Sequence, residues 1–125
     1  MKKKDIRIYL VFWFNQEVKE KYKKLSTYGC TKSGDEFLKF ACVQQEDNKC
    51  LMFDNLLCAF LDKCNEESEL IQELVDTVDG FFNIEIVPRF TSASVPAFVF
   101  DRKLFEFVYS LKNKFKHLEI DMYVI

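Results

Sequence analysis

The stretch IRIYLVFWF, at Ile6–Phe14, decides the fold class of this 125-residue chain. It consists mainly of β-branched and aromatic residues, which are typical of strands, and both alternating sets of positions are apolar except at Arg7. A strand that is apolar on both faces usually lies in the middle of a sheet, where other elements cover it on both sides. We therefore expect a central strand with two covered faces.

Further strands and helices are expected on the C-terminal side of this stretch. Apolar or alternating runs predict strands at 37–43, 50–53, 82–86 and 118–124, and helical spacing predicts helices at 17–25, 54–79 and 101–116. The segment 26–35, with its Gly and Ser residues, is expected to be a loop. The chain has no repeat and no linker, so we expect a single α+β domain over residues 1–125. Its sheet is expected to be mostly antiparallel, with two or three helices packed on one face.

The helical pattern over 54–79 allows two arrangements. Apolar residues recur at helical spacing in two groups, Leu57, Phe60, Leu61 and Cys64, then Ile71, Leu74, Val75 and Val78. The segment between them, Asn65–Ser68, is wholly polar. It is therefore either the outward turn of one long helix or a break between two shorter helices.

Charged residues are segregated along the chain. The formal net charge is −2, but residues 46–79 hold two lysines against ten acidic residues. A pI of about 5.5 argues against a general nucleic-acid binder, which normally has a basic domain. The N-terminal apolar run is shorter than the roughly 20 residues of a membrane span and lacks the cleavage pattern of a secretion signal. We therefore expect a cytoplasmic protein with no membrane or nucleic-acid partner.

The five cysteines, at positions 30, 42, 50, 58 and 64, include no C-x-x-C pair. A closed zinc site normally needs such close ligand pairs, and the single histidine, His117, lies far away in the sequence. We therefore expect reduced thiols, no metal and no cofactor. Cys42, Cys58 and Cys64 fall on apolar periodic positions, where a free thiol behaves as a small hydrophobic side chain, so we expect them in the core.

Candidate catalytic residues are sparse. Nucleophilic catalysis needs a base within hydrogen-bond reach, but the only imidazole, His117, falls at the basic end of a helical pattern, where a surface role is expected. Glu85, Glu119 and Asp121 lie on expected strands and form either a carboxylate cluster or part of the solvent face of the sheet. No glycine-rich phosphate loop and no G-x-S-x-G turn occurs. We therefore expect that the protein is not an enzyme.

The main candidate for a functional surface is acidic. Its residues belong to the helical region and its C-terminal end: Asp62, Glu66, Glu67, Glu69, Glu73, Asp76 and Asp79. A preformed acidic surface speeds the encounter with a basic protein and disfavours wrong partners. The hypothesis is that these side chains bind a basic protein partner, and the alternative is a solvated helix face without a partner.

The last third of the chain has the order strand, loop, short apolar run, helix and closing strand, at Phe82–Ile86, Val95–Phe98, Asp101–Lys116 and Leu118–Tyr123. In this order it resembles a bacterial family, domain-of-unknown-function family 4279. The resemblance covers residues 50–125 and implies two helices before the strand Phe82–Ile86, hence a break at Asn65–Ser68. Small proteins of this kind often act as cytoplasmic immunity proteins beside bacterial toxins. The resemblance therefore implies a non-enzymatic immunity protein whose acidic surface neutralises a toxin, most naturally a nuclease.

A second function is compatible with the sequence, that of a small structural or assembly protein that forms a homodimer. The alternating run Leu118–Ile125 is the last strand signal of the chain. We expect this strand at an edge of the sheet, where its unpaired backbone groups can pair with those of a second copy.

Overall fold

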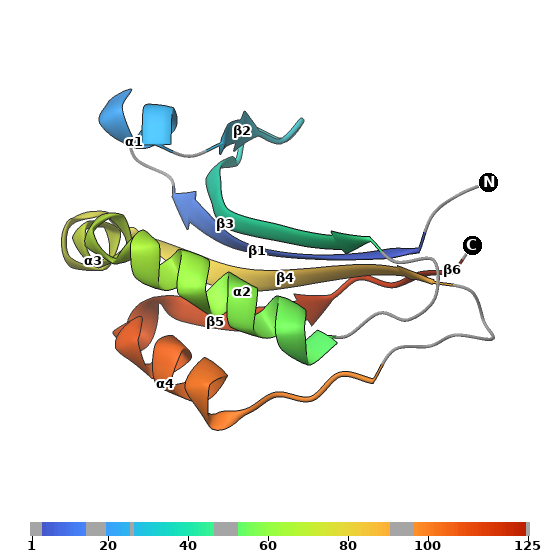
Figure 1. Cartoon of the computed structure of the whole chain (residues 1–125). Coiled ribbons are helices and arrows are strands. Elements are labelled where there is room, and N and C mark those ends of the chain that lie inside the picture. Colours follow the sequence, from blue (N-terminus) through green and yellow to red (C-terminus); the bar gives the residue numbers. More distant parts are fainter. Residues whose placement is uncertain (1–3, 15–19, 26, 47–52, 91–96, 125) are drawn as a thin grey trace.

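A six-stranded sheet forms the framework of the computed structural model, which describes residues 4–14, 20–25, 27–46, 53–90 and 97–124 (Figure 1). Its strands are β1 (Asp5–Phe14), β2 (Thr27–Cys30), β3 (Glu36–Glu46), β4 (Gly80–Phe90), β5 (Phe115–Ile120) and β6 (Tyr123–Val124). They are ordered β2-β3-β1-β4-β5, and β6 also pairs with β4. The pairings among β1 to β4 are antiparallel, whereas β5 and β6 run parallel to β4. The predicted α+β class with a mostly antiparallel sheet is therefore confirmed.

Three helices cover one face of this sheet, as expected (Figure 1). They are α2 (Phe53–Glu66), α3 (Ser68–Thr77) and α4 (Arg102–Ser110), and a 3-10 turn, Lys112–Lys114, leads from α4 toward β5. The short helix α1 (Glu20–Leu25) lies near β2, within the segment where a helix is predicted. The strand predicted at 50–53 lies outside the described residues except for Phe53, which begins α2.

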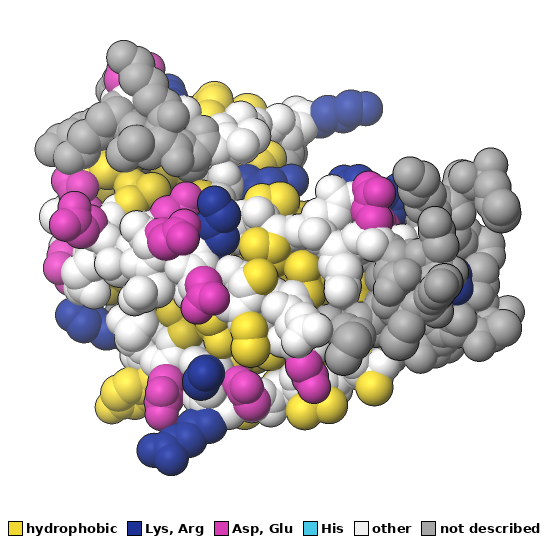
Figure 2. Space-filling view, in the orientation of Figure 1, with side chains coloured by type: hydrophobic (Ala, Val, Ile, Leu, Met, Phe, Trp, Pro, Cys, Tyr) yellow, Lys and Arg dark blue, Asp and Glu magenta, His cyan; other side chains and the backbone are white. Residues whose placement is uncertain are grey.

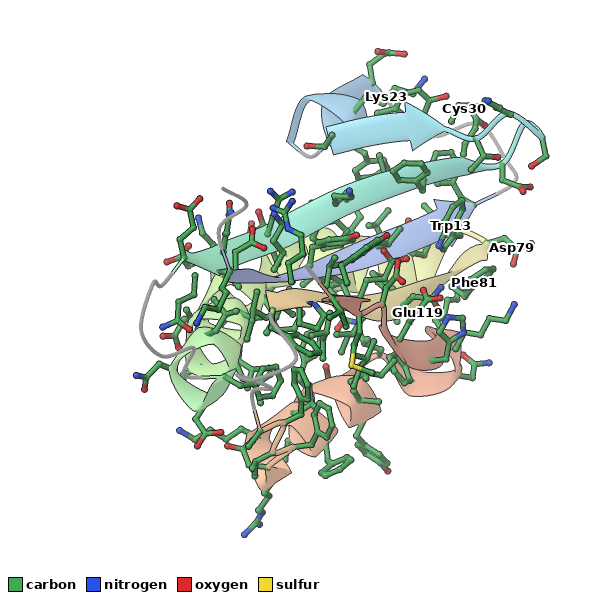
Figure 3. The ribbon with its side chains drawn as sticks, turned by 90° about the vertical axis from the view of Figure 1, so that its right-hand side faces the viewer. Trp13, Lys23, Cys30, Asp79, Phe81 and Glu119 are labelled. Carbon is green, nitrogen blue, oxygen red and sulfur yellow. The ribbon has the colours of Figure 1, made fainter. Side chains whose placement is uncertain are left out.

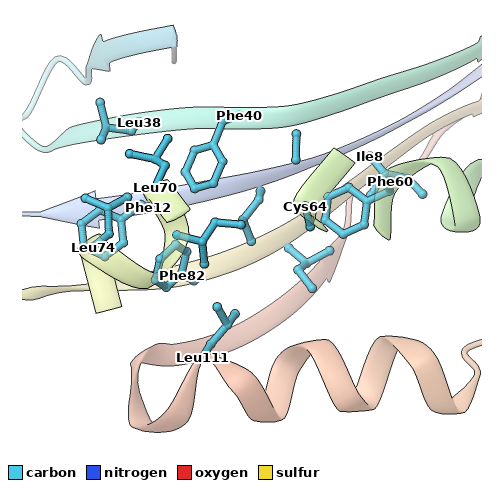
Figure 4. Packing of buried hydrophobic residues seen from close by; sticks show 14 of the residues in the cluster. Ile8, Phe12, Leu38, Phe40, Phe60, Cys64, Leu70, Leu74, Phe82 and Leu111 are labelled. Carbon is cyan, nitrogen blue, oxygen red and sulfur yellow. The ribbon is translucent and has the colours of Figure 1, made fainter. Parts of the chain in front are cut away.

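The core fills the space between the sheet and these helices (Figure 4). Ile8, Phe12 and Phe82 are fully buried there, and the ring centres of Phe12 and Phe82 lie 4.6 Å apart. Phe60 of α2 and Leu74 of α3 are also fully buried. Burial of one such side chain contributes roughly 1.5–3 kcal/mol, so these contacts hold the helices on the sheet.

Strand β1 lies between β3 and β4, which confirms its predicted central position. Its other predicted property, two covered faces, is wrong: among the described residues no helix covers the face that carries Arg7, Tyr9 and Trp13. Tyr9 and Trp13 are only half-buried, by side chains of neighbouring strands. The Trp13 ring centre lies 5.0 Å from that of Phe37, and the Lys39 ammonium lies 4.2 Å above the Tyr9 ring. We call this side of the sheet the open face.

The helical region is two helices and not one. Helix α2 ends at Glu66 and α3 begins at Ser68, while Glu67 between them has φ −101° and ψ 19°. The polar run Asn65–Ser68 therefore marks a break, the arrangement that the family resemblance implied.

A β-bulge in β3 determines which face of the sheet Cys42 joins. Tyr9 of β1 is opposite two residues of β3, Ala41 and Cys42, because the register shifts at this point. Ala41 takes the left-handed conformation, with φ 53°. Regular alternation from the buried Phe40 would direct Cys42 into the core, whereas the extra residue turns it toward solvent.

The prediction of three core thiols is confirmed only for Cys64, which is 1% exposed. Cys42 and Cys58 are both exposed, so the prediction is wrong for them. The bulge accounts for Cys42. Cys58 is rotated by about 100° around α2 from the buried Leu57, which is enough to leave the apolar stripe. Cys30 is exposed as well, and Cys50 lies outside the described residues.

An edge strand occupies part of the segment 26–35 that was expected to be a loop. Strand β2 pairs with β3 over four residues, with Gly29 opposite Phe37. The Phe37 ring fills the space that a side chain at position 29 would need. The sequence pattern presented this glycine as a turn signal, but in the sheet it makes room for a ring on the neighbouring strand.

The last helix begins at its predicted residue and ends early. Asp101 is the N-cap, since its side chain accepts a hydrogen bond of 3.2 Å from the Leu104 N–H. The helix was expected to reach residue 116, but α4 ends at Ser110. Lys112 then takes a left-handed φ of 58°, which no α-helix allows, and the chain turns into β5.

Strand β4 extends on both sides of the predicted 82–86. It continues through Pro88, which was expected to end it. A proline has no N–H to donate within a sheet. Pro88 pairs with Ile6 on one side, and on the other side the neighbouring strands are interrupted between Ile120 and Tyr123, so the missing donor is tolerated.

Candidate functional site

The acidic residues identified from the sequence do not all lie on one surface. Five of them lie along the outer sides of α2 and α3, namely Asp62, Glu66, Glu69, Glu73 and Asp76. We call these five residues the acidic helix surface; Figure 2 shows acidic side chains on this side of the molecule. Glu67 turns toward the sheet, and Asp79 lies just before β4, beside the open face.

Two lysines pair with the acidic helix surface. Lys63 Nζ lies 3.8 Å from Glu66 Oε2, and Lys112 Nζ lies 3.5 Å from Asp76 Oδ1. The pKa of Asp76 is lowered by a hydrogen bond of 2.9 Å from the Gln72 amide and by the charge of Lys112. Exposed pairs of this kind contribute at most about 1 kcal/mol each. The formal charge of α2 and α3 together is negative, because their sequences hold one basic residue, Lys63, against six acidic residues.

Glu67 connects the helices to the sheet. Its carboxylate accepts a hydrogen bond from the backbone N–H of Ala41, at the β3 bulge, and burial raises its pKa. Its Oε2 is buried with no hydrogen-bond partner in the described part of the chain. Glu67 is therefore not presented to a partner. Sequence reasoning grouped it with Glu66 because the two are adjacent in one polar run.

A groove of about 560 Å³ lies on the open face. Figure 3 shows four of its residues near one another: Trp13 from β1, Asp79 just before β4, Phe81 from the start of β4, and Glu119 from β5. Its lining consists of Trp13, Phe14, Asp35, Asp79, Gly80, Phe81, Asn83, Glu85, Lys116, His117 and Glu119. Aromatic rings and carboxylates from four parts of the chain thus meet in one place.

Two carboxylates are neighbours in this groove. Glu85 and Glu119 are register partners on the parallel strands β4 and β5. Burial raises the pKa of Glu85 against a hydrogen bond from Tyr9, and the charge of Glu119 raises it further. His117 Nε2 lies 3.9 Å from Glu119 Oε2. The structure therefore brings together two members of the expected carboxylate cluster, while the third, Asp121, does not line the groove.

Asn83 is a buried polar residue in the lining of the groove. Its side chain is 5% exposed, and its Oδ1 has no hydrogen-bond partner among the described residues. A buried acceptor without a partner costs about 1–3 kcal/mol. The alternating pattern at 82–86 predicted a strand but did not single out Asn83. Strand alternation does place Asn83 on the same face as Phe81 and Glu85, and this was the one sign in the sequence that it belongs with them.

The groove is equipped to bind hydrogen-bond donors. The described residues that line it include no serine, threonine or cysteine, so the lining offers His117 no hydroxyl or thiol to activate. In the same part of the chain, no three His, Cys, Asp or Glu side chains are grouped so as to hold a metal ion. What the lining offers is acceptor oxygens beside aromatic rings.

The C-terminal strands occupy an edge of the sheet, as expected. Strand β5 is last in the strand order, and β6 pairs with the far end of β4. Met122 is 56% exposed and Val124 is 65% exposed. An edge with exposed apolar side chains can pair with another chain.

Comparison with protein-family models, curated proteins and solved structures finds no match to this chain. The resemblance to family 4279 therefore stays a prediction. No helix in the described ranges has both the length and the apolar character needed to cross a bilayer.

Proposed function

We propose that this protein is a non-enzymatic binding protein that recognises a basic protein partner through the acidic helix surface. The observation that carries this proposal is the alignment of five carboxylates along the outer sides of two consecutive helices. Both helices are anchored by buried apolar stripes, so the charges are held in place before a partner arrives. A preorganised surface loses less conformational entropy on binding.

The partner class that fits best is a bacterial toxin with a basic substrate groove. A nuclease needs such a groove because its substrate carries a phosphate charge at every nucleotide. An acidic surface that covers the groove would block substrate entry with one copy per toxin molecule. The resemblance of residues 50–125 to family 4279 supports this function, that of a cytoplasmic immunity protein.

Co-expression with the product of the neighbouring gene tests the proposal. We expect the two proteins to purify together, and we expect the dissociation constant of the complex to rise with salt. Exposed charges are screened over about 10 Å at 0.1 M salt and about 3 Å at 1 M, so an electrostatic complex weakens over this range.

Charge reversal with a matched control locates the interface. The double variant Asp62→Lys, Glu69→Lys alters the acidic helix surface, and Glu20→Lys, Glu106→Lys makes the same change of net charge elsewhere. We expect the first pair to weaken binding by at least about tenfold, equivalent to about 1.4 kcal/mol, and the second to have little effect. Equal affinity for both double variants would refute the proposed interface.

A second candidate function, homodimer assembly, is favoured by the exposed apolar residues at the C-terminal edge. Met122 and Val124 flank β6 or belong to it, and β5 presents the last backbone edge of the sheet in the described part of the chain. Pairing of two such edges would extend the sheet across two copies and bury these side chains.

The mass of the purified protein in solution tests this second candidate. A mass that rises from monomer to dimer with concentration, and that returns to monomer in Val124→Lys, would support it. Val99→Lys is the matched control, since Val99 is also exposed but lies before α4. A monomer at every concentration contradicts it.

A further inference from the structure

The groove on the open face favours a positively charged occupant. Its lining includes Glu85 and Glu119, which are register partners on β4 and β5, and the basic groups of Lys116 and His117. The Lys116 ammonium lies 4.5 Å above the Phe81 ring. An anion beside Glu85 and Glu119 would be repelled by both carboxylates, whereas a cation between them would relieve their mutual repulsion.

The groove also has a polar residue whose buried oxygen lacks a hydrogen-bond donor in the described part of the chain. Asn83 Oδ1 is an acceptor in the lining of the groove without a donor among the described residues. The neighbouring Glu85 and Glu119 are acceptors as well when ionised. An occupant that carries several N–H groups can donate to the two carboxylates, and an amide flip of Asn83 about χ2 would be needed to bring its buried Oδ1 into contact with such an occupant.

The aromatic wall of the groove distinguishes among cations. Trp13 is half-buried, with its ring held against Phe37, and lies directly across the strands from Phe81. A guanidinium group is planar, stacks on aromatic rings and presents five N–H donors in a fixed fork that matches carboxylates. An ammonium group is compact, more strongly hydrated and has three donors. The combination of rings with paired carboxylates favours the guanidinium group.

We infer that the groove bounded by Trp13, Asn83, Glu85 and Glu119 is a binding site for a guanidinium group. The group belongs either to a free small molecule or to an arginine side chain of a peptide or protein. The volume of about 560 Å³ accommodates an arginine side chain together with part of its backbone. This site goes beyond the proposed function, because it lies on the opposite face of the sheet from the acidic helix surface.

Titration with arginine derivatives tests the site. Trp13 is the single tryptophan, so its indole N–H gives one NMR signal that reports directly on the groove. We would add capped arginine (Nα-acetyl-L-arginine amide), agmatine and capped citrulline, the last being nearly isosteric with arginine but uncharged. We expect saturable shifts of the Trp13 indole and Asn83 amide signals with a guanidinium compound, and no saturation with citrulline.

Variants of Glu85 and Glu119 test whether the guanidinium compound binds in the groove. In Glu85→Gln, Glu119→Gln we expect affinity for capped arginine to fall at least about tenfold. Glu106→Gln, on α4, is the control and should bind like the wild type. If the double variant does not fold, Glu119→Gln alone can replace it, because the Glu119 side chain is half-exposed. This single variant should bind capped arginine less tightly than the control.

The outcomes separate the sources of the guanidinium group and can overturn the site. Agmatine binding at least as tight as capped arginine indicates a free small molecule, whereas preference for capped arginine indicates a side chain of a peptide or protein. The inference is wrong if citrulline binds as well as arginine, if the carboxylate variants bind like the control, or if no saturable shift occurs up to about 50 mM ligand. None of these results depends on the acidic helix surface, so the two proposals fail separately.

Discussion

Asp5 and Arg89 lie opposite each other on β1 and β4 and are joined by two hydrogen bonds of 2.7 Å. Asp5 is 2% exposed, and it also accepts hydrogen bonds from the side chains of Gln44, at 2.8 Å, and Arg7, at 3.3 Å. The hydrogen bonds from Arg89 lower the pKa of Asp5 against the opposing effect of burial. A charged residue thus occupies a buried position on the open face because three strands supply donors to it.

Replacing Arg89 should destabilise the protein in a pH-dependent way. Arg89→Met leaves a buried carboxylate short of two donors, so we expect the free energy of unfolding at pH 7 to fall by about 2 kcal/mol. A lowered carboxyl pKa gives stability above the unfolded value of 3.8 that is lost as pH falls through the folded pKa. Urea unfolding should therefore show the difference from wild type shrinking below pH 3.8. Arg102→Met, which removes an exposed pair with Glu106, should cost less than about 0.5 kcal/mol and is the control.

Neutralising Glu67 should stabilise the protein at neutral pH. Burial raises the pKa of Glu67, so the folded state binds its proton more tightly, and stability is lost as pH rises from the unfolded value of 4.5 through the folded pKa. Glu67→Gln keeps an acceptor for the Ala41 N–H and removes this loss. In urea unfolding we expect Glu67→Gln to be more stable than wild type at pH 7, with no such gain below pH 4.5. Glu66→Gln, at the exposed neighbouring position, is the control and should change the free energy of unfolding by less than about 0.5 kcal/mol. A Glu67→Gln variant that is less stable than wild type at pH 7 would contradict the prediction.

Two glycine variants should differ in their cost. A Cβ at Gly80 would collide with the backbone oxygen of Trp13 and the Phe12 ring, whereas the three atoms nearest to one at Gly29 all belong to the Phe37 ring. The backbone of β1 cannot move without loss of its pairing to β4, while a ring can rotate. We expect Gly80→Ala to lower the free energy of unfolding by roughly 3 kcal/mol and Gly29→Ala by less. Denaturant titration of both variants checks this order. The reverse order would show that the pairing of β1 with β4 shifts to make room for a methyl group at position 80.

The described cysteines should react at very different rates. Cys64 is buried and its pKa is raised by burial, so little reactive thiolate is available, whereas Cys30, Cys42 and Cys58 are exposed. We expect iodoacetamide to modify the three exposed thiols in the native protein and Cys64 only after unfolding. Mass spectrometry of proteolytic peptides resolves the sites. Native-state modification of Cys64 at the rate of Cys58 would contradict the buried position.

Local patterns in the sequence were sufficient for much of the fold. The composition of Ile6–Phe14 predicted a central strand, and the polar run Asn65–Ser68 marked the place where a helix break was one of two arrangements. The start of the last helix was predictable at residue 101, because the Asp101 cap depends on a hydrogen bond to a residue only three positions away. Each of these features depends on neighbours within a few turns or strand residues.

The sequence did not predict the features that depend on pairing between distant segments. The bulge at Ala41 arises from the register between β1 and β3, and it alone exposes Cys42. The difference between the exposed Glu66 and the half-buried Glu67 likewise depends on where that bulge meets the helix break. A slip of one residue moves a side chain to the other face of a sheet, and no local pattern records it.

The sequence by itself determined the α+β class, the central position of Ile6–Phe14 and the acidic character of the helical region, because periodicity and composition are local properties of the chain. Only the tertiary structure decided that the described helices leave one face of the sheet uncovered, and that Trp13, Asn83 and Glu119 share a groove. These residues come from strands far apart in the chain. Their proximity follows from strand order and register, which long-range packing of the whole core selects.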